Sequence, residues 1–151
     1  MISKVWTRYY SINDWYKVYK EYQKFERRVV KVTHIYDYDE KSFTMEGIRG
    51  ENLKDVILEN RISFHQKQNI LEQITHIFSN MFKFKSRECD LFWHDDLQLK
   101  NFIYTYDNDV KLIDPDSFIP IKFDNNSHYE FEIGKFTNTI NNLHMSLLKW
   151  E

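Results

Sequence analysis

Hydrophobic positions in the first third of the chain switch between strand-like and helix-like spacing. The opening aromatic and β-branched run, VWTRYY, is typical of a short strand. It is followed by apolar side chains at steps of three and four, which predict an amphipathic helix that Ser11, Asn13 and Asp14 can cap. The elements expected here are a strand at 5–10, a helix at 14–28, and two strands of a hairpin at 29–38 and 42–48.

The rest of the chain begins at a break in this pattern. The segment from Gly47 to Gly50 predicts a hinge. The strongest helical periodicity of the chain follows at 65–84, where one apolar stripe should be buried. Around it the sequence predicts a short helix near 53–58, an apolar step at 91–93, strands at 101–106 and 110–113, irregular chain from 115 to about 127, and a helix at 129–148. Together these elements predict an α+β fold.

Composition limits the classes of function. Of the 151 residues, 42% are hydrophobic and 17% aromatic, which is enough to build a core in one domain or in two small lobes. The net charge of -2 gives no basic excess for nucleic-acid binding. The single Cys89 excludes an internal disulfide framework and a cysteine-rich zinc site. With no long apolar run and no signal-like start, we expect a cytoplasmic protein without a membrane or nucleic-acid partner.

Glycine and alanine are unusually scarce. Three scattered glycines cannot form the Rossmann fingerprint or the P-loop, so both nucleotide-binding motifs are excluded. Alanine is absent, while residues with AT-rich codons are plentiful. This bias favours a virus or a low-GC bacterium as the source, and host cytoplasm as the location if the source is viral.

The polar residues with chemical potential gather in one segment, 92–118. Asp96 precedes Asn101 by five positions, and Asp114 follows Asn101 by thirteen, across the predicted hairpin. Because a hairpin returns its second strand beside the start of its first, Asn101 and Asp114 should face each other. Two oxygen ligands suit Mg²⁺, and Asp96 would lie near the metal, where it could orient or deprotonate a hydroxyl. The alternative, that such residues are ordinary caps and turn formers, applies better to Asp107–Asp109.

Two of these motifs resemble known ones. HDDLQLKN, 94–101, is similar to the catalytic loop H-x-D-L-x-x-x-N of the protein-kinase-like superfamily, and VKLIDPD, 110–116, is similar to its metal-binding segment. Matched position by position, the resemblance implies that Asp96 is the catalytic aspartate and that Asn101 and Asp114 are the metal ligands. His94 matches the histidine that orients the loop. The implied cofactors are ATP and Mg²⁺ or Mn²⁺.

The resemblance also implies a fold and a nucleotide cleft. It predicts an abbreviated two-lobe kinase-like fold, with a reduced N-lobe at 1–47 and a reduced C-lobe at 48–151. The segment FTMEGIRGENLKDVI resembles the strand, hinge and first helix of such kinases. The backbone of Glu46, Gly47 and Ile48 would then meet the adenine.

The cation for the ATP phosphates is less clear from the sequence. No glycine-rich loop is present, and the position of the ATP-binding lysine aligns best with Arg8, with Lys4 as the other candidate. Glu21 or Glu26, on the following helix, would be its ion-pair partner. These assignments come from the resemblance and from the order of the residues along the chain.

Departures from the family pattern set the order of the functional hypotheses. Asp95 and Gln98 stand where protein kinases have arginine and lysine, so the loop is more similar to those of aminoglycoside, choline or capsular-sugar kinases. The leading hypothesis is transfer of phosphate from ATP to a hydroxyl of a small molecule or sugar. A non-catalytic pseudokinase or nucleotide-binding module that interacts with a protein partner is the alternative, and a protein kinase is the third. The sequence also leaves open whether the chain forms an oligomer.

Overall fold

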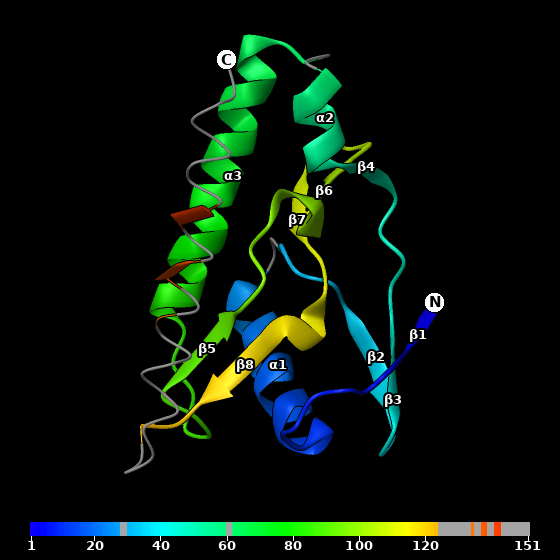
Figure 1. Cartoon of the computed structure of the whole chain (residues 1–151), viewed down its shortest axis with the longest axis vertical. Helices are drawn as coiled ribbons and strands as arrows, with labels where there is room; N and C mark the ends of the chain where they lie inside the picture. The colour runs from blue at the N-terminus through cyan, green and yellow to red at the C-terminus, as the bar shows by residue number, and fades with distance from the viewer. Residues whose placement is uncertain (28–29, 60–61, 124–133, 135–136, 139–140, 143–151) are drawn as a thin grey trace.

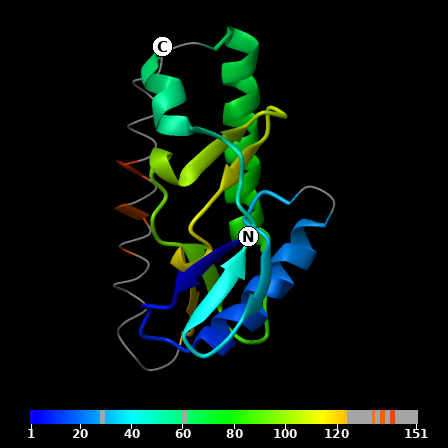
Figure 2. The ribbon, with the colours of Figure 1, turned by 90° about the vertical axis from the view of Figure 1, so that its right-hand side faces the viewer.

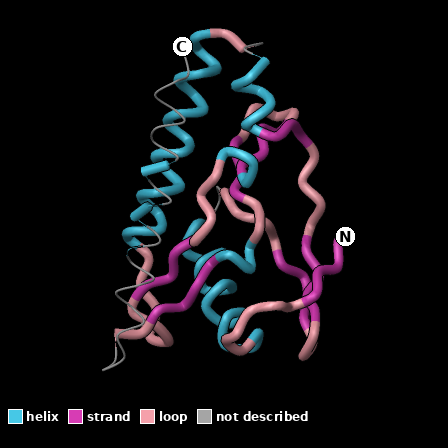
Figure 3. The backbone as a smooth tube through the Cα atoms, in the orientation of Figure 1, coloured by secondary structure: helices cyan, strands magenta, loops and turns pink. Residues whose placement is uncertain are grey.

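The computed structural model describes residues 1–27, 30–59, 62–123, 134, 137–138 and 141–142. Its helices are α1 (Ile12–Glu26), α2 (Leu53–Glu59) and α3 (Phe64–Lys83), with short 3-10 helices η1 (Leu99–Asn101) and η2 (Pro115–Ser117). Its strands are β1 (Ile2–Val5), β2 (Ile35–Tyr38), β3 (Ser42–Met45), β4 (Gly50–Asn52), β5 (Leu91–His94), β6 (Phe102–Thr105), β7 (Val110–Leu112) and β8 (Phe118–Ile121). Figure 1 shows these elements in space, and Figure 3 colours them by type.

The described strands form small antiparallel sheets, in the orders β1-β3-β2, β4-β6-β7 and β5-β8. In the first sheet, β1 and β3 lie side by side, as the view in Figure 2 shows. In the second, a Cβ atom at Gly50 would lie 2.3 Å from the Tyr104 carbonyl oxygen, so β4 can approach β6 only without a side chain there. The α+β class and the β6–β7 hairpin are as predicted, and the element order is consistent with the abbreviated kinase-like fold.

Helix α1 supplies the centre of the core. Ser11 caps it by accepting hydrogen bonds from the backbone N–H groups of the first turn. Its inner face buries Trp15, Tyr19 and Tyr22 completely. Trp15 packs on Phe43 of the first sheet with ring centroids 5.0 Å apart, while Tyr22 packs on Phe118 of β8 at 5.1 Å. The helix therefore lies between two sheets and is covered by both.

Helix α3 is the long vertical helix of Figure 1 and matches the predicted 65–84 closely. Ser63 and Gln66 form a capping box at its start. Its buried stripe is made of Ile70, Ile74, Ile77 and Met81. Within the described part of the chain, no helix is long and apolar enough to cross a membrane.

The segment that leads from α1 into β2, here called the connecting segment (30–34), packs on the β6–β7 hairpin. Val32 forms a parallel bridge with Leu112, and the Leu112 N–H donates to the Lys31 carbonyl at 2.7 Å. The buried Lys31 ammonium donates to Gln73 of α3 at 2.6 Å. The same Gln73 oxygen accepts from the Val110 N–H at 2.7 Å. The connecting segment, α3 and β7 are thus fixed to one another by polar groups.

Glu26 belongs to this network, which corrects its predicted role. Its buried carboxylate accepts from the Lys31 N–H at 3.1 Å and from the Asn80 amide at 3.2 Å. Since Glu26 lies at the end of α1 against α3, it is not the ion-pair partner expected for Arg8 or Lys4. Burial raises the pKa of Glu26 to about 7, although these hydrogen bonds oppose the shift.

Several predicted bounds differ from the structure. The first strand is Ile2–Val5 and not 5–10, because Trp6 packs on Trp15 of α1. The strand expected at 29–38 is limited to Ile35–Tyr38. The segment expected to be irregular after residue 115 contains β8, where Pro120 is tolerated because only one side of β8 pairs. The predicted helix at 129–148 lies largely outside the described residues.

We predict that Glu26 contributes a fall in the free energy of unfolding as pH rises from roughly 5 to 8, opposed below about pH 6.5 by the buried neutral His94, and that Glu26→Gln removes the Glu26 contribution. The pKa of Glu26 is raised in the folded chain, so its contribution is complete below the unfolded value of 4.5 and is lost as pH rises through about 7. The loss should be on the order of 3 kcal/mol. Urea denaturation at several pH values measures it. Glu72→Gln, on the exposed side of α3, should behave as the wild type; parallel pH profiles for both variants would contradict the prediction.

Candidate functional site

The candidate site is built on the ends of β5 and of the β6–β7 hairpin. β5 leads through His94 into the loop 95–98, and η1 then leads into β6 at Asn101. On the other arm, β7 ends before Asp114, which is the N-terminal cap residue of η2. The Ile113 N–H donates to the Asn101 carbonyl at 2.8 Å. The hairpin therefore brings residue 101 beside residues 113 and 114, as its predicted geometry required.

His94 is fully buried and joins the two arms of the site. Its Nδ1 accepts from the Asp96 N–H at 3.1 Å, so its Nε2 is the protonated nitrogen and donates to the Ile113 carbonyl at 2.9 Å. Burial lowers the pKa of His94, although the hydrogen bond to Ile113 opposes that shift. The imidazole is therefore neutral and positions the loop, the role that the resemblance implies.

Asp96 and Asn101 are directly coupled. The Asn101 amide nitrogen donates to the Asp96 carbonyl at 2.7 Å and to its carboxylate Oδ2 at 3.0 Å. Gln98 donates to the other carboxylate oxygen, Oδ1. These hydrogen bonds fix the position of the Asp96 side chain in the loop 95–98. They occupy the amide nitrogen of Asn101, so its Oδ1 is the side-chain atom that could bind a metal.

Asp114 adopts a backbone conformation that is unusual for its type. Its φ of 59° and ψ of 64° lie in the left-handed region, which costs energy for a residue with a Cβ atom. The turn is held by neighbours on both sides, because the Ser117 N–H donates to the Asp114 carbonyl at 2.9 Å and Trp15 donates to the Pro115 carbonyl at 3.0 Å. The left-handed backbone, which aspartate tolerates better than most residues with a Cβ atom, marks the position as a functional candidate.

Lys4 places a cation on this turn. Its ammonium lies 3.2 Å from Asp114 Oδ1 and 2.9 Å from Asp116 Oδ1. The Asp116 side chain is only 6% exposed, whereas that of Lys4 is 36% exposed. Burial alone would lower the pKa of Lys4, but the hydrogen bond and charge of Asp116, with a smaller contribution from Asp114, raise it. Lys4 is therefore a permanent positive charge beside the expected metal ligand.

Arg8 contacts the end of η2 and the start of the loop 95–98. Its guanidinium donates to Ser117 Oγ at 3.1 Å and lies 3.6 Å from Asp95 Oδ1. The Asp95 side chain is buried, and the Asp95 N–H donates to the Ser117 carbonyl at 2.8 Å. Both cations suggested by the sequence thus reach the site, but Lys4 is the one that meets Asp114.

The other residues expected from the sequence lie apart from this ion pair. Glu46, Gly47 and Ile48 form the extended connection from β3 to β4, and a Cβ atom at Gly47 would approach the Ile2 side chain of β1 at 3.5 Å. Glu21 is exposed on α1. Among the described residues, the ion pairs of Lys4 are with Asp114 and Asp116, and not with either glutamate of α1.

The oxygen donors present fit a hard divalent cation. Asp114 supplies a partly exposed carboxylate, and Asn101, on the arm whose backbone bonds Ile113, supplies an amide oxygen; carboxylate and amide oxygens are groups that Mg²⁺ prefers together with water and phosphate oxygens. In the described part of the chain, no group of three or more histidine, cysteine, aspartate or glutamate side chains is arranged to hold a metal. A metal held here would therefore need ligands from a bound phosphate or from water.

Residues that sequence analysis did not assign to the site hold the strained turn in place. Tyr10 directs its hydroxyl at the carbonyls of Asp116 and Phe118, at 3.1 and 3.0 Å. The indole of Trp15 bonds the Pro115 carbonyl. The aromatic spacing indicates that these side chains are buried, but nothing in the sequence indicates that their polar atoms reach a turn 100 or more residues away.

Comparisons with known proteins were made with the whole chain. No protein-family model and no curated protein matches it. It is similar to the crystal structure of monomeric WbdD, with 14% identity, a TM-score of 0.44, and coverage of 91% of this chain and 34% of that one. It is also similar to WbdD co-crystallised with a kinase inhibitor, with 18% identity, a TM-score of 0.48, and coverage of 93% and 33%. The chain spans about a third of the length of these structures.

We predict that His94→Leu lowers the free energy of unfolding by about 2–4 kcal/mol, because the Asp96 N–H and the Ile113 carbonyl would lose their buried partner. Urea denaturation near neutral pH measures the loss. His65→Leu, at an exposed position of α3, is the matched control and should stay within about 0.5 kcal/mol of the wild type. A cost for His94→Leu no larger than for the control would contradict the bridging role.

Proposed function

We propose that this protein is an ATP- and Mg²⁺-dependent phosphotransferase that acts on a hydroxyl group of a small molecule or sugar. Asp96 orients or deprotonates the hydroxyl, Asn101 and Asp114 hold the metal, and Lys4 neutralises the phosphates. The observation on which the proposal rests is the contact between Lys4 and Asp114, at the end of the β6–β7 hairpin whose other end follows the Asp96–Asn101 pair.

The charges of the site support this division of roles. Phosphoryl transfer depends mainly on positioning and on neutralising the charge of the transferred group. Lys4 and a metal on Asp114 would bring two cations to one place, while Asp96 remains fixed by Asn101 and Gln98. Lys4 thus replaces Arg8 as our candidate for the phosphate cation, since Arg8 is engaged with Ser117 and Asp95.

A second candidate is a nucleotide-binding module without transfer activity. It is favoured by the Asp96 carboxylate, because each of its oxygens already accepts a hydrogen bond from Gln98 or Asn101. If the protein is a phosphotransferase, Asp96→Asn should abolish ATP consumption in the presence of a hydroxyl acceptor while nucleotide binding persists. If it is a binding module without transfer activity, the wild type itself should bind nucleotide and consume none.

We predict that Mg²⁺ with ATP raises the melting temperature of the protein, and that Asp114→Ala removes this rise because the metal loses its only carboxylate in the proposed site. ATP at 100 times its dissociation constant should add about 2.7 kcal/mol of stability, which a thermal melt resolves. Asp107→Ala, in the exposed β6–β7 turn, is the matched control and should keep the full effect. An unaltered shift in Asp114→Ala would show that the metal site is wrong.

We further predict that Lys4→Ala weakens ATP binding by roughly tenfold to a hundredfold, the effect of losing a charge-assisted contact with phosphate. Adenosine should be affected far less, because it has no phosphates. Isothermal titration calorimetry of the folded variants measures both. Arg8→Ala serves as the comparison and should change ATP affinity little. If Arg8→Ala weakens ATP binding and Lys4→Ala does not, the assignment of the two cations is reversed.

A further inference from the structure

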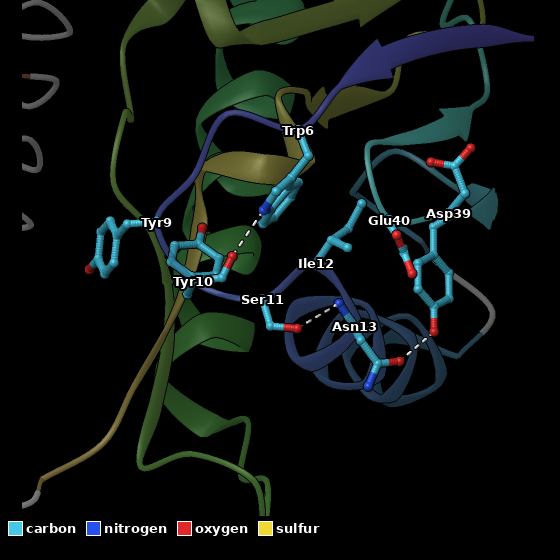
Figure 4. Close-up of a pocket in the computed structure, with 9 residues that line it drawn as sticks. Trp6, Tyr9, Tyr10, Ser11, Ile12, Asn13, Asp39 and Glu40 are labelled. Carbon is cyan, nitrogen blue, oxygen red and sulfur yellow. Dashed lines mark hydrogen bonds between the residues drawn. The ribbon is translucent and has the colours of Figure 1, made fainter.

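An aromatic groove of about 590 Å³ lies outside the candidate site, between the segment after β1, the start of α1 and the β2–β3 turn (Figure 4). Asp96, Asn101 and Asp114 are not among the residues that line it. The side chains that matter for its chemistry are Trp6, Tyr10, Asn13, Tyr38, Asp39 and Glu40. The proposed reaction assigns no chemical role to these side chains, although the Tyr10 hydroxyl also bonds the backbone of the turn at Asp116.

The aromatic walls of the groove are held in place by the rest of the fold. The Trp6 indole donates to the Tyr10 carbonyl at 2.9 Å, and the two rings meet edge to face at 5.4 Å. Trp6 also rests on the buried Trp15, at 4.8 Å between ring centroids. On the other wall, the Tyr38 hydroxyl bonds to Asn13 at the start of α1. A ligand would therefore meet preformed rings and would pay little to order them.

The charge of the groove has one sign. Asp39 and Glu40 stand across the groove from Trp6 and Tyr10 (Figure 4), and no lysine, arginine or histidine lines it. Hydrogen bonds from the backbone N–H groups of Lys41 and Ser42 lower the pKa of Asp39, so its carboxylate is ionised at neutral pH. Carboxylates would repel a nucleotide phosphate. They attract a cation, and the aromatic rings attract the same kind of group through their negative faces.

We propose that this groove binds an arginine side chain of a partner protein. A planar guanidinium can stack on Trp6 or Tyr10 while its N–H groups reach the Glu40 carboxylate, a combination that a compact ammonium matches less well. The Asp39 carboxylate adds negative charge nearby, while its oxygens accept hydrogen bonds from Lys41 and Ser42 within the turn. The inference goes beyond the proposed phosphotransfer and does not depend on it.

The experiment uses the whole ¹⁵N-labelled chain and two peptides, Gly-Arg-Gly-Arg-Gly and Gly-Gln-Gly-Gln-Gly, both amidated. The readout is the indole N–H signal of Trp6, assigned from the spectrum of Trp6→Phe. We expect a saturable shift with the arginine peptide that weakens with added salt, and none with the glutamine peptide. Glu40→Gln should weaken binding by about 1.5-fold to fivefold, the effect of losing an exposed ion pair.

Glu72→Gln is the matched control, because it makes the same change of net charge at an exposed position of α3 and should leave the affinity unchanged. Equal affinities of Glu40→Gln and Glu72→Gln, or an equal shift with the glutamine peptide, would overturn the proposal. The nucleotide melts are measured separately on Glu40→Gln. Their outcome tests the phosphotransferase site, so failure of one proposal is distinguishable from failure of the other.

Discussion

The structure depends on burying the aromatic face of helix α1 between two β-sheets. Trp15, Tyr19 and Tyr22 of α1 are fully buried because β3 covers them on one side and β5-β8 on the other. Large rings let a short chain bury much apolar area with few residues. Two of the three polar atoms form hydrogen bonds as well, since Trp15 donates to the Pro115 carbonyl and Tyr19 donates to the Thr33 carbonyl at 2.7 Å. The core that closes the fold therefore also fixes the backbone of the site.

The site combines a rigid half with a charged half. The rigid half is the neutral His94, whose two ring nitrogens hold the loop at Asp96 and the arm that leads to Asp114. The charged half is formed by Lys4 and two aspartates, and one of these, Asp116, is almost completely buried. A buried carboxylate needs a partner, because an isolated charge away from water is costly. Lys4 therefore contributes to the stability of the turn, whatever its part in the proposed chemistry.

Short-range patterns predicted the parts of the fold that depend on neighbours in sequence. The stripe of α3 and the β6–β7 hairpin follow from spacing, and the hairpin alone was enough to place Asn101 beside Asp114. The position of β1 could not be predicted, because the strand ends where Trp6 packs on Trp15 of α1 and Tyr10 bonds the backbone of Asp116 and Phe118, and these are contacts of tertiary packing. That position decides that Lys4 and not Arg8 meets Asp114. Glu26 was misassigned for the same reason, since its partners, Lys31 and Asn80, are determined by tertiary packing.

The bonds between the start of the chain and η2 have a consequence for the order in which the protein can fold. Lys4 and Trp15 find their partners about a hundred residues downstream, at Asp114 and Pro115. During synthesis, α1 therefore leaves the ribosome long before β8 is available to cover it. Its aromatic face is exposed in the nascent chain, and closing so long a loop is a slow, entropically costly step. The geometry of the candidate site thus forms only after nearly all of the described chain has been made, and an interrupted chain leaves behind an uncovered aromatic surface that favours aggregation.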